Sequence, residues 1–161
     1  MRLLVTALLA IGLTGTQSVA LSCLRPDPIE TFQRLAAAEE SYFVLYGAFD
    51  FDEGLLPEPD LSNQERTPEP IPGRFTGKGL SHEGFVGDYI ANVNLQIQCF
   101  GPWCGGAASG VPAVWFVPFS EPPATLQADP CGSMTFYEPS DAVMRMLESC
   151  MAGGTCTPVT E

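Results

Sequence analysis

Cys99 and Cys104, in the segment CFGPWCGG, are the residues whose types and spacing first suggest chemistry. Two thiols separated by four residues can form a redox-active dithiol, provide two metal ligands, or make a disulfide that closes a turn. Each of these three roles needs different partner residues elsewhere in the chain, so the remaining sequence indicates which role applies.

The spacing argues against a redox-active dithiol. The thioredoxin-type motif Trp-Cys-Gly-Pro-Cys separates its thiols by two residues, whereas Trp103-Cys104-Gly105-Gly106 is followed by Ala107. A reactive thiolate also needs a nearby cation or a helix N-terminus. The positive charges in the sequence neighbourhood are Arg74 and Lys78, some distance upstream. We therefore expect no redox catalysis at this segment.

The sequence also lacks the residue patterns that metal binding or hydrolysis would need. Zinc sites use CxxC pairs or histidines at ligand spacing, and His82 is the single histidine of the sequence. Ser81 precedes it directly, which does not build a dyad, and Ser109 in GAASG lies one residue off the GxSxG pattern. Asp50-Phe-Asp-Glu-Gly begins like a calcium loop, but the later ligands do not follow. We expect no catalytic residue, no metal and no cofactor.

The first twenty residues predict a secretory signal peptide. One Arg precedes the apolar run Leu3–Leu13, and Ser18 and Ala20 occupy the minus-three and minus-one positions of a cleavage site. We expect cleavage after Ala20 and a mature chain, residues 21–161, that forms a single periplasmic or secreted domain. Beyond the leader, no segment is long and apolar enough to cross a bilayer.

Two other forms of processing compete with this one. Cleavage after Ser22 would place Ala20 at minus three and make Cys23 the first residue. A lipobox ending at Cys23 is disfavoured, because Ala20 stands where Leu is preferred.

The charge of the chain limits its partners. The sequence carries seven Lys and Arg and nineteen Asp and Glu, a net charge of -12; because Arg2 lies in the leader, six basic residues remain. Such a chain is repelled by nucleic acid and by anionic lipid. We expect a protein or a small ligand as partner, no nucleic acid and no stable membrane insertion.

Six cysteines follow the leader, and an even number in an exported chain predicts three disulfides. Gly101-Pro102 is a turn-former, which favours a Cys99–Cys104 bond. A helix that stops at Ala-Gly-Gly places Cys150 beside Cys156. By elimination Cys23 pairs with Cys131, and a Cys23–Cys104 bond is the alternative.

The N-terminal half contains a helix, a strand and a long insertion. The segment 26–42 has apolar residues at helical spacing, and FVLYGAFDF, residues 43–51, reads as a buried strand. Residues 52–73 carry five prolines and six acids against one Arg, which predicts a solvated loop. A binding loop is the functional alternative. A short strand over 74–80 follows.

The segment 91–99 alternates apolar and polar residues, as expected of a strand with one buried face. Its polar positions are four neutral amides, Asn92, Asn94, Gln96 and Gln98. They suit a solvent-exposed face, or alternatively a surface that hydrogen-bonds sugar or peptide.

The C-terminal half adds two strands and a helix. The segment 111–119 reads as a strand whose prolines suggest an edge or a bulge, and 124–131 as a short strand. The segment 139–151 is an amphipathic helix with proline in its first turn and glycines after its end. Five short strands with a helix at each end predict a mainly β, α+β fold: a small antiparallel five-stranded OB-like barrel, stapled by disulfides.

The order of these features resembles the netrin-like domain of tissue inhibitors of metalloproteinases. It comprises an early Cys23, a short helix, the strand 43–51, a later CGG, the apolar strand 110–119, and Cys131 after a further short strand. The resemblance covers roughly residues 23 to 151. It implies an OB-type five-stranded barrel flanked by helices, and a bridge from Cys131 to the N-terminal segment.

In that family, a free N-terminal cysteine chelates the protease zinc through its amine and carbonyl. Cys23 holds this position here, but the family's Cys-x-Cys is reduced to one cysteine, and Leu21-Ser22 precede it under the preferred cleavage. We therefore expect an exported, non-enzymatic binding module. The alternatives are an inhibitor of an exported metalloprotease, and a small periplasmic hydrolase or thiol-redox enzyme.

Overall fold

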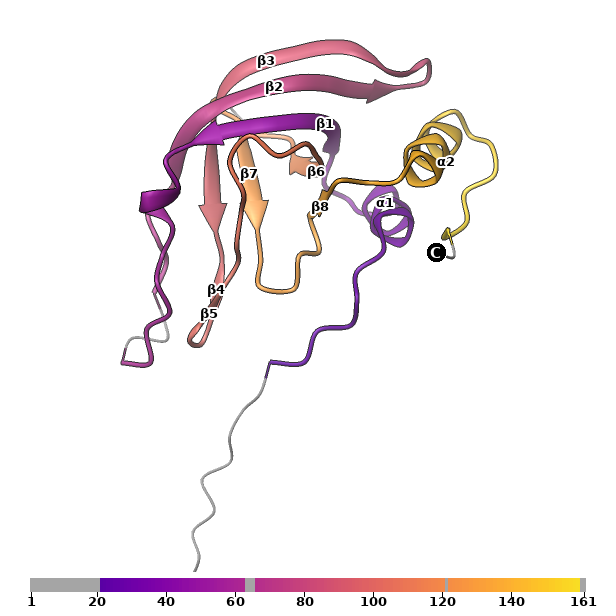
Figure 1. Ribbon diagram of the computed structural model, residues 1–161. Coiled ribbons are helices and arrows are strands. Elements are labelled where there is room, and N and C mark those ends of the chain that lie inside the picture. Colours follow the sequence, from indigo (N-terminus) through magenta and orange to yellow (C-terminus); the bar gives the residue numbers. More distant parts are fainter. Residues whose placement is uncertain (1–20, 63–65, 121, 160–161) are drawn as a thin grey trace, which may run out of the picture.

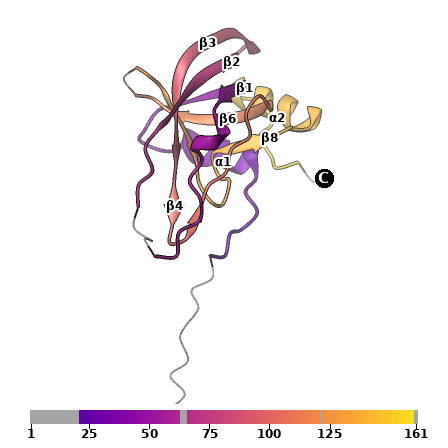
Figure 2. The ribbon, with the colours of Figure 1, turned by 60° about the vertical axis from the view of Figure 1, so that its left-hand side comes forward.

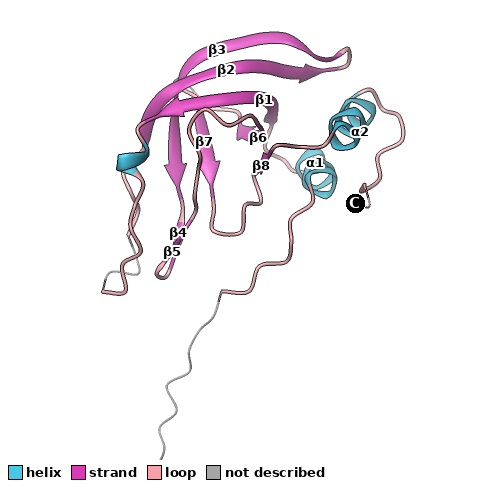
Figure 3. Cartoon of the chain, in the orientation of Figure 1, coloured by secondary structure: helices cyan, strands magenta, loops and turns pink. Residues whose placement is uncertain are grey.

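Six strands form one curled sheet, and two helices pack beside each other against its outside (Figure 1). The computed structural model describes residues 21–62, 66–120 and 122–159. The expected signal peptide, residues 1–20, and its cleavage site lie outside or at the border of the described residues. Secondary structure along the chain is coloured in Figure 3, and strands dominate it.

The first three strands form an antiparallel meander, and the later strands are added on both sides of it. In sheet order the strands are β7 (Thr125–Ala128), β3 (Gly84–Ile97), β2 (Ile71–Ser81), β1 (Tyr42–Phe51), β6 (Ala113–Pro118) and β8 (Thr135–Tyr137). All neighbouring pairs are antiparallel except β3 and β7, which run parallel. The expected strands 43–51 and 74–80 thus lie within β1 and β2, whereas the expected strand 91–99 begins inside β3 and runs two residues past its end.

Close packing of two glycines helps the sheet to curl. Gly47 of β1 and Gly77 of β2 face each other in register. A Cβ on Gly47 would clash with the carbonyl oxygen of Thr76, and one on Gly77 with that of Tyr46. Glycine alone permits this approach of two backbones, and such positions mark bends in sheets.

The curl brings the two edge strands of the sheet close to each other. Thr135 of β8 donates a hydrogen bond from its hydroxyl to the carbonyl oxygen of Gln127 in β7, at 3.0 Å. Just after β3, the backbone N–H of Gln98 donates to the carbonyl oxygen of Ala128 at 2.9 Å and extends the parallel β3–β7 ladder. The sheet is therefore a half-barrel, and the hydrogen bond from Thr135 to Gln127 crosses the opening between β7 and β8.

The sheet has an apolar core on each of its faces. Inside the curl, the rings of Phe49, Phe75 and Trp115 are almost fully buried. Outside it, Val114 and Phe116 pack against the helices. Strand β6 supplies residues to both cores, so it is an interior strand. The edge position expected from its prolines is wrong, because they lie at or beyond the strand ends, where their missing N–H groups break no ladder.

The two helices begin with side-chain caps. Asp27 caps α1 (Pro28–Ala36) by accepting hydrogen bonds from the backbone N–H groups of Ile29 and Glu30, at 2.8 and 2.9 Å. Ser140 caps α2 (Asp141–Met151). Such caps satisfy N–H groups that lack partners within the helix. The mainly β fold with a helix at each end agrees with the sequence prediction.

The number and direction of strands differ from the prediction. The sheet has six strands, where five were expected, and the β3–β7 pair is parallel, where all pairs were expected to be antiparallel. The loop expected over 52–73 ends at residue 70, since Ile71 begins β2 and is buried in the inner core. The parallel pair forms because the chain leaves β6 and crosses to β3, which local periodicity does not reveal.

All six cysteines are in disulfides, with the pairs Cys23–Cys131, Cys99–Cys104 and Cys150–Cys156. These are the pairs preferred from the sequence, and the alternative Cys23–Cys104 bond is absent. The first connects residues 108 positions apart, whereas the other two close loops of five and six positions. Disulfides of this kind indicate an oxidising compartment.

Candidate functional site

A second, two-stranded hairpin follows β3 and extends from one end of the half-barrel (Figures 1 and 2). Its strands are β4 (Cys99–Phe100) and β5 (Trp103–Cys104). Cys99 lies opposite Cys104, and their disulfide closes the hairpin at its base. Gly101 has a φ of 60° in the turn, a conformation that suits glycine.

The tip of this hairpin carries two exposed aromatic side chains. Phe100 and Trp103 are directly opposite each other in register, and their exposed fractions are 50% and 41%. Although Trp103 lies next to the turn, its side chain is substantially exposed to solvent. Large aromatic side chains that stay exposed on a rigid element are typical of surfaces that bind other molecules.

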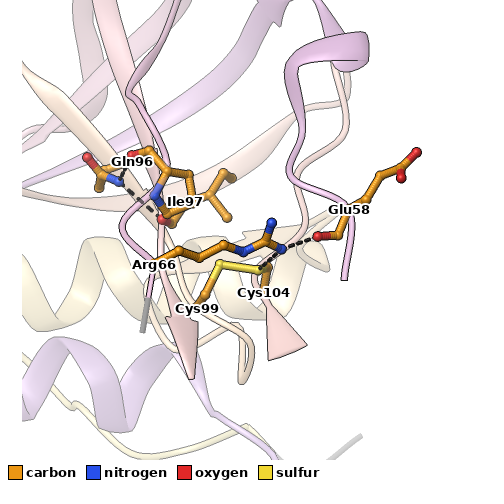
Figure 4. The surroundings of a disulfide bond; sticks show 7 residues. Glu58, Arg66, Gln96, Ile97, Cys99 and Cys104 are labelled. Atoms are coloured by element: carbon orange, nitrogen blue, oxygen red, sulfur yellow. Dashed lines mark hydrogen bonds between the residues drawn. A yellow bond between two sulfur atoms is a disulfide. The ribbon is translucent and has the colours of Figure 1, made fainter. Parts of the chain in front are cut away.

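The described parts of the loop, residues 52–62 and 66–70, are held to the hairpin by Arg66 and to β3 by Gln96 (Figure 4). The side-chain amide of Gln96 donates to the carbonyl oxygen of Pro68 at 2.9 Å. The guanidinium of Arg66 donates to Cys104 Sγ at 3.3 Å and to the carbonyl oxygen of Glu58. At the start of the loop, Leu56 packs against the inner core. The loop is therefore attached at both ends and in its middle.

The fold brings a cation, Arg66, closer to the cysteine pair than the cations that the sequence suggested. The cations expected nearest the cysteine pair were Arg74 and Lys78, but the fold places Arg66 directly on Cys104 Sγ. The Nε–H of Arg66 is buried and has no hydrogen-bond partner. A charged donor left unsatisfied in this way is costly unless an acceptor appears.

The four amides of β3 and its extension fall into two groups. Gln96 and Gln98 are used within the chain, since Gln96 holds the loop and Gln98 donates to the side chain of Gln127 at 3.3 Å. Asn92 and Asn94 instead line a shallow hollow of about 490 Å³ on the outer surface of the sheet. The predicted amide row is therefore only half available to a ligand.

Two charged residues lie beside Asn92 and Asn94 in the hollow. Asp50, Arg74 and Asn92 lie side by side on β1, β2 and β3, because they are aligned in register. Pro123 completes the hollow from the loop before β7. The site offers one acid, one guanidinium and two amides, which is the composition of a weak, polar contact surface.

The serine and histidine candidates have structural positions. Ser81 is the last residue of β2, where its hydroxyl donates to the carbonyl oxygen of Gly84 and accepts from the N–H of Glu83, both at 3.2 Å. His82 is exposed in the turn that follows, between β2 and β3. Ser109 accepts from the N–H of Phe51 at 3.0 Å, in the connection after the hairpin. The structure assembles no nucleophile–base pair from these residues.

One tyrosine supports the segment that follows the hairpin. The hydroxyl of Tyr137 accepts a hydrogen bond from the N–H of Ala108 at 3.0 Å. Burial raises the pKa of Tyr137 above its ordinary value, the hydrogen bond from Ala108 opposes this, and the charge of Glu53 adds to it. The neutral hydroxyl therefore holds the segment after the hairpin to β8.

Within residues 21–62, 66–120 and 122–159, no group of three or more His, Cys, Asp or Glu side chains is placed to hold a metal ion. In the same part of the chain, no helix has the length and apolarity needed to span a bilayer.

The residues of this site were only partly visible in the sequence. The cysteines and the Gly-Pro turn between them were identified, and the aromatic residues on either side of that turn are the signal that would have placed Phe100 and Trp103 at an exposed tip. Arg66 offered no signal, because 38 positions separate it from Cys104.

Comparisons with known proteins provide no relative for this geometry. A scan against protein families, a search of curated proteins and a search of solved structures each find no match. The function is therefore argued from the residues and contacts of this chain.

Proposed function

We propose that this protein is an exported, non-enzymatic binding module that recognises a protein partner through the tip of the Cys99–Cys104 hairpin. One observation carries the proposal: Phe100 and Trp103 face each other, exposed, on a hairpin that a disulfide closes. Aromatic side chains on a preorganised element bind at a low entropic cost. The three disulfides and the predicted signal peptide support export.

The charge beside the hairpin favours a cationic partner. The described parts of the loop, residues 52–62 and 66–70, contain five acids, and their single cation, Arg66, is directed to Cys104. A surface with an aromatic centre and an acidic border complements a basic surface that offers an apolar pocket. The partner is then a protein or peptide segment that combines Lys or Arg with apolar side chains.

The architecture we propose for this module is the OB-like barrel of the netrin-like domain. The proposal is supported by the strand order, in which the first three long strands form a meander, β6 pairs with the first of them, and β7 pairs with the third. The hydrogen bond from Thr135 to Gln127 across the opening also supports a partly open barrel. In this description β8 is an addition beside β6.

Inhibition of an exported metalloprotease is the second candidate function. It is favoured by the disulfide from Cys23 to Cys131, which fixes the N-terminal segment to the domain, and by Leu24, whose exposed fraction is 92%. Zinc chelation by an N-terminal cysteine needs a chain that starts at Cys23. Edman sequencing of the mature protein tests this: a start at Leu21 removes the mechanism, and a start at Cys23 supports it.

The binding proposal is tested by selecting ligands from a library of displayed random peptides with the oxidised mature protein. We expect enrichment of peptides that combine basic and apolar residues, with affinities that fall as salt is added. The double variant Phe100→Ala/Trp103→Ala should lose this binding. The matched variant Val86→Ala/Ile90→Ala, which removes two comparably exposed side chains from β3, should keep it. Enrichment of no such peptide, or equal binding by both variants, would contradict the proposal.

A further inference from the structure

We propose that the Cys99–Cys104 disulfide is a thiol–disulfide exchange site, opened by a dithiol reductant, with Cys104 as the leaving sulfur. The observation behind this is the contact of the Arg66 guanidinium with Cys104 Sγ at 3.3 Å (Figure 4). Both cysteine residues are partly exposed, as exchange with an external thiolate requires. The site is a property of this chain beyond the binding function proposed above.

The position of Arg66 determines which sulfur leaves. A guanidinium beside a sulfur stabilises the thiolate form of that cysteine. In thiol–disulfide exchange, the sulfur that forms the more stable thiolate leaves faster. Attack is therefore directed to Cys99, and the electron pair of the broken bond is received by Cys104 Sγ next to Arg66.

The buried Nε–H of Arg66 also favours a thiolate at Cys104. Its Nε–H is buried without an acceptor while the disulfide is intact. A neutral disulfide sulfur is a weak acceptor, whereas a thiolate is a strong one. Reduction thus places a negative charge on Cys104 Sγ, next to the Arg66 guanidinium, which has one buried N–H without an acceptor.

The exchange is a two-electron transfer in two steps. The thiolate of the reductant attacks Cys99 Sγ; a new S–S bond forms between reductant and Cys99, and the Cys99–Cys104 bond breaks, leaving Cys104 as thiolate. The second thiol of the reductant loses its proton and attacks its own sulfur in this mixed disulfide, which releases Cys99. The reductant ends as a disulfide, Cys99 takes up one proton, and one proton is left in solution.

The other two disulfides lack this arrangement. Among the residues that the structure describes, no Lys or Arg side chain hydrogen-bonds a sulfur of Cys23–Cys131 or Cys150–Cys156. Cys150 is also buried in the core between sheet and helices. The Cys150–Cys156 bond closes a loop of similar length, so it serves as the internal reference for the reactivity of Cys99–Cys104.

Opening the bond would alter the face that carries Phe100 and Trp103. The hairpin would lose its covalent closure, and Arg66 would be held by a thiolate instead of a disulfide sulfur. An effect of the redox state on partner binding rests on the proposed function, whereas the exchange chemistry does not. The two are therefore tested separately.

The experiment is timed reduction of the folded, oxidised mature protein with dithiothreitol at neutral pH, followed by acid quenching, alkylation and peptide mass spectrometry. We expect Cys99–Cys104 to be reduced at least about tenfold faster than Cys150–Cys156. With glutathione in place of dithiothreitol, the trapped mixed disulfide should be on Cys99. Equal rates for the two disulfides, or glutathione mainly on Cys104, would overturn the proposal.

Two substitutions isolate the contribution of Arg66. Arg66→Gln should slow reduction of Cys99–Cys104 several-fold and leave Cys150–Cys156 unchanged. Arg74→Gln, which removes an exposed cation from β2, should leave both rates unchanged. An Arg66→Gln protein that reduces like the original would refute the assigned role. Circular dichroism of each variant verifies the fold, and because no partner is used, a negative outcome leaves the binding proposal standing.

Discussion

Two disulfides of this protein close loops of almost the same length, yet they differ in burial and in the polar groups around them. Cys150–Cys156 lies where α2 ends, and Cys150 is buried between helix and sheet. Its loop is held further by the hydroxyl of Ser149, which donates to the carbonyl oxygen of Thr155 at 2.7 Å. Cys99–Cys104 instead closes an extending hairpin with Phe100 and Trp103 at its exposed tip.

Cysteine spacing therefore does not determine the surroundings of a disulfide. At the end of α2, the bond fastens the following segment to core residues and short-range hydrogen bonds. At the hairpin, the cysteines pack against the rim of the inner core, and a cation from a distant loop contacts one of their sulfurs. The Cys150–Cys156 bond stabilises the fold at the end of α2. The Cys99–Cys104 bond keeps two exposed aromatic side chains in place beside a sulfur that contacts a guanidinium.

We expect removal of disulfides to have the largest effects on the free energy of unfolding, with the greatest loss for Cys23–Cys131. Because it connects the most distant residues, replacing both cysteines with Ala should lower the free energy of unfolding by about 5 kcal/mol. Cys99→Ala/Cys104→Ala should lower it by only about 2 kcal/mol. Cys150→Ala/Cys156→Ala should cost somewhat more than this, since Cys150 packs in the core. Urea denaturation followed by circular dichroism measures all three, and a hairpin pair costlier than the helix pair would contradict the comparison.

A second pair of variants contrasts the side chains of the two regions. Leu147 of α2 is fully buried, so Leu147→Ala should cost roughly 2–5 kcal/mol of unfolding free energy. Trp103→Ala should cost about 0.5 kcal/mol or less, because the ring is partly in solvent and surface substitutions have small effects. The same urea titration measures both. A loss of several kcal/mol on removing Trp103 would mean that the hairpin tip is part of the core and not a binding surface.

Deletion of residues 57–70 examines the loop that lies against the hairpin. We expect a folded domain with a loss of about 1 kcal/mol, since the deletion removes the Gln96–Pro68 hydrogen bond and the Arg66 contacts but keeps Leu56 and Ile71. Thermal unfolding provides the measurement. The deleted protein should also show the slow Cys99–Cys104 reduction of Arg66→Gln. Failure to fold would show that the loop is a structural element of the half-barrel.

An effect of similar size, and dependent on pH, is expected at Tyr137. Tyr137→Phe leaves the N–H of Ala108 without its acceptor and should cost about 1 kcal/mol at neutral pH. Burial raises the pKa of Tyr137, so the folded state retains this proton more strongly than the unfolded state. The associated stability is present below about pH 10 and declines as pH rises through the folded-state pKa. Urea titrations from pH 8 to 11 should show a shallower alkaline decline in the variant, and identical slopes would contradict this.

The sequence allowed the elements and the disulfides to be predicted, but not their spatial relations. Alternation along 91–99 correctly placed Val93, Leu95 and Ile97 inward, because burial of one face imposes a period of two. The parallel β3–β7 pair and the interior position of β6 depend on long-range strand order, which no local pattern encodes. Arg66 reaches Cys104 only because the loop folds back along the hairpin.

We propose that the hairpin tip, and not the neighbouring sheet surface, contacts a partner. Site-specific photo-crosslinking tests this contact, with a benzophenone amino acid placed at Trp103 or at Ile90 in the protein expressed in its producing cell. We predict a covalent adduct from position 103 that is lost on deletion of residues 57–70, and none from position 90. Adducts of equal yield at both positions, or an adduct at position 90 alone, would contradict the claim.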